Sequence, residues 1–166
     1  MPEPPTTRAP LLRARLMIGL VALGLLLSGV TIWPMEWELS TAIRLLWGSA
    51  PASDGTVHAF LLRVLDAWRT TARDTPFLLY GFDWLAYAHL MLAVLFAMVL
   101  KDPVRNVLVL RFGLVCCACV PILAGACIPL RGIPLPWFLL DASFAPACAL
   151  PLWIALRDVR RLEPPQ

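Results

Sequence analysis

Four ionisable side chains stand out because they lie in or beside long apolar segments, where an unpaired charge is costly. They are Asp83, His89, Arg131 and Asp141. Two carboxylates and an imidazole can bind a cation or relay a proton, and an arginine can hold an anionic head group. The alternative is a structural lock, in which Arg131 pairs with Asp141 or Asp83 while His89 bonds a backbone carbonyl. We prefer the lock, because most of these residues lie near an expected membrane interface, where water reaches them.

The spacing of these residues does not favour a metal site. Asp83 and His89 are six positions apart, and no acid–histidine pair within this cluster has the i, i+3 or i, i+4 spacing of helical metal ligands. Cys116 and Cys119 form a C-x-x-C pair, but no second pair and no activating base or cation lies nearby. All five cysteines fall in apolar segments, so we interpret them as small packing residues. No catalytic residue, cofactor or metal is therefore predicted.

A second polar group lies between two apolar segments. Asp102, Arg105 and Asn106 belong to a segment, residues 101–106, that is typical of a tight turn. Asp102 suits the N-cap of a following helix, Pro103 suits its first position, and Arg105 can pair with Asp102. A structural role explains this segment fully.

The elements that must position these residues are four apolar segments in a chain of 166 residues that is 60% hydrophobic. Each is about long enough to cross a hydrocarbon core of ~30 Å. The sequence therefore predicts an all-α fold, an integral membrane four-helix bundle. The expected spans are residues 14–33, 78–100, 104–130 and 137–156. Small residues four apart predict close helix contacts at Gly24/Ser28, Gly113/Cys117 and Ala145/Ala149.

The remaining segments complete the domain organisation. We expect a disordered tail over residues 1–10, a transmembrane domain over 11–161 and a short tail over 162–166. The loop over residues 34–77 contains an amphipathic stripe, which predicts a helix near residues 56–73 between the first and second spans. Its apolar positions are Val57, Phe60, Leu61, Val64, Leu65 and Trp68, with a start near Ser53–Gly55; a shorter helical piece is expected over Leu39–Trp47.

The distribution of positive charge predicts the orientation of the chain. Basic residues precede the first span, separate the second from the third, and follow the fourth, at Arg8, Arg13, Arg15, Lys101, Arg105, Arg157, Arg160 and Arg161. With four spans these places share one side, which the positive-inside rule makes cytoplasmic. Both termini are then cytoplasmic, and the amphipathic helix is extracytoplasmic. The preference for Arg over Lys, with much Ala, Leu and Pro, is typical of a GC-rich bacterial gene, so the expected location is a bacterial inner membrane. The net charge of +3 is too small and scattered for nucleic-acid binding.

Three segments carry a family resemblance. They are residues 80–89 (YGFDWLAYAH), 102–106 (DPVRN) and 131–134 (RGIP), the last followed by Trp137, Asp141, Ser143 and Phe144. Together they resemble an uncharacterised family of small bacterial four-helix membrane proteins over about residues 76–157. The resemblance implies an integral membrane protein and no particular activity. Arg111 departs from it, because an acid is expected before Phe112.

Two functions follow as hypotheses. The first is a protein without enzymatic activity that acts by contact with the lipid bilayer, another membrane protein or further copies of itself. The lack of any nucleophile–base pair or nucleotide motif in the sequence favours it. The alternative is a small oligomeric transporter or membrane enzyme, which would require Asp83, His89 and Asp141 to converge on one cavity.

Overall fold

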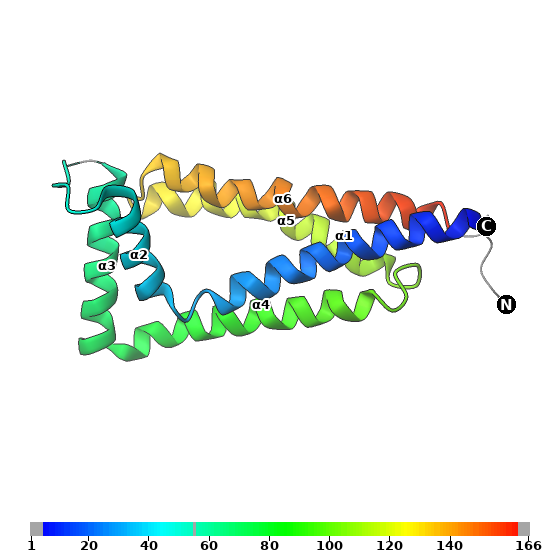
Figure 1. Ribbon diagram of the computed structural model, residues 1–166, viewed down its shortest axis with the longest axis horizontal. Helices are drawn as coiled ribbons and strands as arrows, with labels where there is room; N and C mark the ends of the chain where they lie inside the picture. Colours follow the sequence, from blue (N-terminus) through cyan, green and yellow to red (C-terminus); the bar gives the residue numbers. More distant parts are fainter. Residues whose placement is uncertain (1–4, 55, 163–166) are drawn as a thin grey trace. The chain divides into compact units, whose positions relative to one another are not determined.

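The computed structural model describes residues 5–54 and 56–162, and all regular secondary structure in this part of the chain is helical, without a strand. It contains six α-helices and one 3-10 helix (Figure 1). Their bounds are α1 (Pro5–Val30), α2 (Met35–Trp47), α3 (Val57–Asp74), η1 (Pro76–Leu79), α4 (Tyr80–Val99), α5 (Val107–Leu130) and α6 (Leu135–Arg160).

Four of these helical segments are long and apolar enough to cross a membrane, as the sequence predicted. They are Arg8–Val30, Pro76–Val99, Val107–Leu130 and Leu135–Arg160. The boundaries of the spans differ from the predicted ones by up to six residues. At the first span, α1 already begins at Pro5, so residues 5–10, expected in a disordered tail, are helical. Residues 1–4 and 163–166, which hold the rest of the two expected tails, lie outside the described residues.

The chain divides into two compact units, which we describe separately. The terminal unit consists of Met1–Leu25 together with Leu92–Gln166, and the central unit is Leu26–Met91. The expected single transmembrane domain over 11–161 thus contains residues of both units.

The terminal unit is built on the antiparallel pair α5 and α6, which lie side by side (Figure 1). Its core joins apolar side chains of α1, α4, α5 and α6, including Ile18, Val99, Leu110 and Leu152. The tightest approach is at Gly113, where an added Cβ would lie 2.8 Å from both Leu152 Cδ1 and Phe96 Cζ. A side chain at this position would displace one of these two groups, so the glycine permits the contact.

The small-residue pairs predicted from the sequence have different outcomes. Gly113 and Cys117 are buried, which confirms this part of α5 as a contact face. Gly24 and Ser28 are exposed, and no atom lies within 4 Å of a Cβ placed on Gly24. The close-packed glycine of α1 is instead Gly29, in the central unit.

In the central unit, the end of α1 packs against the first half of α4. A Cβ on Gly29 would lie 3.0 Å from the Ala86 carbonyl oxygen and 3.2 Å from His89 Cβ. Ala86 is completely buried, so two small residues face each other at this crossing. Figure 1 shows α3 running across the direction of α4 in this unit.

The hairpin of α2 and α3 confirms the amphipathic helix expected in the loop. Leu61 and Leu65 are buried, and the polar positions Arg63 and Arg69 are exposed. Other predicted stripe residues are half-buried (Phe60, Val64 and Trp68), while Val57 is exposed.

Two contacts link α2 and α3. The rings of Trp47 and His58 stack with centroids 4.7 Å apart, and Arg69 Nε donates to Glu36 Oε1 at 2.8 Å. The helix α3 begins later than Ser53–Gly55, because Thr56 is its N-cap and its Oγ1 accepts the Ala59 amide.

Candidate functional site

The central unit has a shallow hollow on α4 of about 260 Å³, lined by Tyr80, Asp83, Trp84 and Tyr87. These positions are spaced i, i+3, i+4 and i+7, so they form one face of the helix. The three aromatic residues are about half exposed, and neighbouring rings meet edge to face. The face therefore combines one carboxylate with three rings.

Asp83 is hydrogen-bonded to a residue of the turn that joins α1 to α2. Its Oδ1 accepts a hydrogen bond of 3.1 Å from the Trp33 indole Nε1. Within residues 26–91, apart from the undescribed Gly55, no cationic side chain lies within ion-pair distance of this carboxylate. The Asp83 charge is consequently balanced by no basic residue of its own unit.

His89 does not share a contact with Asp83, although both lie on α4 in the same unit. Its Nδ1 donates to the Leu85 carbonyl oxygen at 2.8 Å, one turn earlier in the helix. This is the backbone bond expected for His89 in a structural role. It also leaves Nε2 as the ring nitrogen able to accept a hydrogen bond.

The expected ion pair between Arg131 and Asp141 is not formed among the described residues. Arg131 is exposed, and Asp141 is half-buried with no hydrogen-bond partner in this part of the chain. The reason is their placement. Arg131 is the C-cap of α5, where its amide donates to the Cys127 carbonyl, whereas Asp141 lies six residues into α6, about 9 Å along the axis. The pairing of Arg131 with Asp83 joins two units and stays a prediction.

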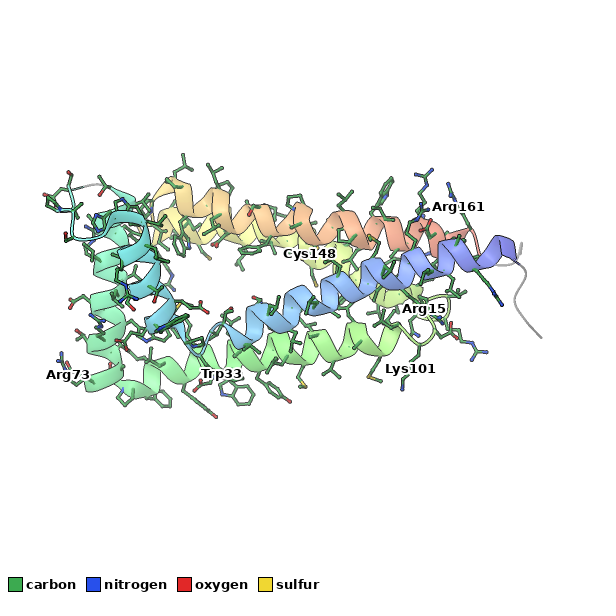
Figure 2. All side chains as sticks on the ribbon, viewed as in Figure 1. Arg15, Trp33, Arg73, Lys101, Cys148 and Arg161 are labelled. Atoms are coloured by element: carbon green, nitrogen blue, oxygen red, sulfur yellow. The ribbon has the colours of Figure 1, made fainter. Side chains whose placement is uncertain are left out.

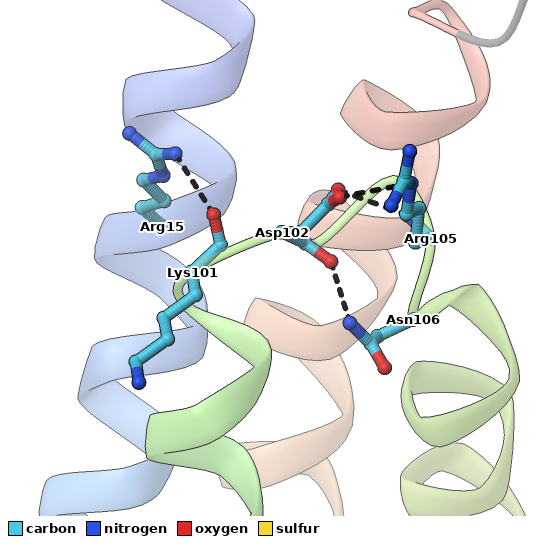
Figure 3. A network of polar contacts seen from close by, with 5 residues as sticks. All are labelled: Arg15, Lys101, Asp102, Arg105 and Asn106. Carbon is cyan, nitrogen blue, oxygen red and sulfur yellow. Dashed lines mark hydrogen bonds and ion pairs between the residues drawn. The ribbon is translucent and has the colours of Figure 1, made fainter.

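The turn before α5 contains the predicted contacts of Asp102 (Figure 3). Arg105 Nε lies 3.3 Å from Asp102 Oδ2, and the Arg105 amide donates to Asp102 Oδ1 at 3.2 Å. Asn106 Nδ2 donates to the Asp102 carbonyl at 2.7 Å, while Arg15 donates to the Lys101 carbonyl at 3.2 Å.

The helix that follows this turn begins later than the sequence predicted. Asp102 closes a turn rather than capping the helix, because α5 begins only at Val107, after its N-cap Asn106. The observed contacts of Asp102 with Arg105 and Asn106 are local, and a purely structural role for the segment stays a prediction.

The strongest polar contact of the terminal unit was missed by the sequence analysis. Arg13 on α1 donates from Nε and Nη2 to the two carboxylate oxygens of Asp158 on α6, each at 2.5 Å. The Asp158 side chain is completely buried, whereas that of Arg13 is 55% exposed. Such a two-pronged arginine–carboxylate bond fixes geometry as well as charge, so it ties the first helix to the last.

Two sequence signals could have indicated this pair. Asp158 lies in the last turn of α6, where the helix dipole disfavours a negative charge. In the sequence Asp158 is also flanked by Arg157, Arg160 and Arg161, so it is a negative residue in an otherwise positively charged segment. An acid in so unfavourable a place requires a specific partner. The sequence alone, however, offers several arginines for that role.

The packing interpretation holds for two of the five cysteines. All five are free, and Cys117 and Cys148 pack in the core of the terminal unit, whereas Cys116, Cys119 and Cys127 are exposed. Among residues 5–54 and 56–162, no group of three or more histidine, cysteine or acidic residues is placed to hold a metal ion.

Comparison of the chain with family models, with curated proteins and with solved structures finds no match.

Proposed function

We propose that this chain is a multi-pass inner-membrane protein of a bacterium, which acts by contact with lipid or a membrane partner rather than by catalysis. In this proposal the four apolar helical segments form a transmembrane bundle with both termini in the cytoplasm. The α2–α3 hairpin then lies on the extracytoplasmic side. We also propose membership of the uncharacterised four-helix family that residues 80–89, 102–106 and 131–134 resemble.

The distribution of charge supports the orientation. In Figure 2, Arg15, Lys101 and Arg161 gather at one end of the terminal unit. Arg13 and Arg105 belong to the same region through their bonds to Asp158 and Asp102. Basic residues remain on the cytoplasmic side during insertion, because their translocation is disfavoured.

The α2–α3 hairpin is the observation that carries the contact function. On α2, Trp37, Leu45 and Leu46 expose 66%, 78% and 68% of their surface. α2 also exposes Glu36 and Arg44, and α3 exposes Arg63, Arg69 and, to a smaller extent, Leu62, so the most exposed large apolar side chains of the hairpin lie on α2. A hairpin of this kind can place α2 against an apolar surface while α3 stays in water.

The occupant of the α2 surface can be lipid, another membrane protein or a second copy of the chain. Large exposed apolar patches in proteins mark contact sites of these kinds.

The orientation has a direct test. Reporter fusions after residues 50, 103, 133 and 166 should read outside, inside, outside and inside, because the basic segments stay in the cytoplasm. Paired reporters that are active on opposite sides of the membrane provide the control at each position. An outside signal at residue 166 would overturn the proposed topology.

The contact function predicts different neighbours for the two helices of the hairpin. A photoreactive amino acid at Leu45 should cross-link in native membranes to lipid, to a membrane protein or to a second copy. The same group at Arg63 is the matched control and should give little product, because this position faces water. Mass spectrometry identifies the product. Equal cross-linking at both positions, or none at Leu45, would contradict the proposal.

A further inference from the structure

We propose that the hollow on α4 binds the ammonium group of a zwitterionic phospholipid head group. The site rests on the proposed function, because a lipid head group can reach it only if α4 crosses the membrane with this end at a surface. Its residues are those that line the hollow, Tyr80, Asp83, Trp84 and Tyr87.

The aromatic rings of the hollow can attract a cation. The Tyr80 and Trp84 rings meet at 76° with centroids 6.0 Å apart, and those of Trp84 and Tyr87 meet at 85° and 5.7 Å. An edge-to-face contact covers at most one face of one ring in each pair, and the three residues stay about half exposed, so ring surface remains open to a ligand. An ammonium group within about 6 Å of a ring centroid is attracted to its negative face.

The Asp83 carboxylate lies among these rings. Asp83 Oδ1 accepts the Trp33 indole N–H, while Oδ2 has no hydrogen-bond partner among the described residues of the central unit. A carboxylate among aromatic rings on an apolar helix requires a counter-charge or water. A ligand cation supplies that charge, and an anionic head group would be repelled.

Size and location indicate the source of the cation. About 260 Å³ accommodates an ammonium group with its substituents, but not a whole lipid. Tyrosine and tryptophan prefer the membrane–water interface, which is also the level of the head groups. The helical segment Pro76–Val99 is apolar enough to be a span, and the hollow lies near its beginning. The acyl chains would then follow the apolar surface of α4 beyond Tyr87.

The test is native mass spectrometry of the detergent-purified full chain with added phosphatidylethanolamine, phosphatidylcholine or phosphatidylglycerol. We expect the two ammonium lipids to bind about five- to tenfold more tightly than phosphatidylglycerol, as for one ion pair with cation–π contacts. Asp83→Asn and Trp84→Leu should each reduce that preference at least about threefold. Asp66→Asn and Trp153→Leu are matched controls, because both residues are exposed outside the hollow, and they should leave it unchanged.

Several outcomes would overturn the site. They are equal binding of all three lipids, an unchanged preference in Asp83→Asn, and binding of free choline or ethanolamine at least as tight as that of the lipids, which would indicate a soluble ligand. Increased binding of ammonium lipids by Arg131→Gln would also overturn it, because Arg131 would then be the natural cation of Asp83.

The proposed function fails in a different way from the site. A chain that does not incorporate into nanodiscs of any of these lipids would contradict the membrane function. Incorporation without any preference among head groups would contradict the site alone.

Discussion

Asp158→Ala is expected to lower the thermal unfolding midpoint of the detergent-purified protein by on the order of 5 °C. The substitution removes both hydrogen bonds from Arg13 and leaves a cavity beside buried residues of α6. It also leaves the arginine on α1 without its partner. Because the pair joins residues 145 positions apart, the contact between the first and last helices should weaken first.

Three variants separate the causes. Asp66→Ala removes an exposed acid from α3 and should change the midpoint by less than about 1 °C. Arg13→Lys keeps the charge but cannot form the two-pronged bond, so it should fall between the wild type and Asp158→Ala. The double change Arg13→Leu/Asp158→Leu should recover much of the loss, since no charge remains unpaired. An Asp158→Ala protein as stable as the wild type would show that the Arg13–Asp158 pair does not stabilise the contact between α1 and α6.

Gly113→Val should be the second strongly destabilising change, costing about 1–3 kcal/mol. Its new side chain would occupy space held by Leu152 and Phe96, both already 2.8 Å from an added Cβ. Either these groups leave their positions or α5 moves away from its neighbours. Thermal unfolding in detergent and the yield of folded protein measure the effect.

Gly125→Val is the matched control on the same helix. The nearest atom to a Cβ at that position is 3.7 Å away, on Phe138, which is an ordinary contact distance. The change in helix propensity is the same in both variants, so their difference reports the packing at Gly113. Equal stability of the two variants would show that Leu152 and Phe96 rearrange at no cost.

The sequence by itself determined the four helical segments that can cross a membrane, although residues 5–10 of the first helix were expected in a tail. Apolar runs of sufficient length leave a chain few other conformations, because backbone groups in lipid must bond within the segment. The stripe over α3 was equally readable, since Leu61 and Leu65 repeat at helical spacing. The bond between Asp102 and Arg105 was predictable because it is local, three residues apart.

Only the tertiary structure decided which distant residues meet. Arg13 and Asp158 pair across the chain, whereas the equally plausible pair of Arg131 and Asp141 does not form among the described residues. Gly29 and Gly113 are packed while Gly24 is open, although all three lie in apolar helices. The physical reason is that a contact depends on the rotation and depth of each helix. The rotation and depth of a helix are set by the packing of all its neighbours together. The periodicity of one segment shows only which face of that helix is apolar.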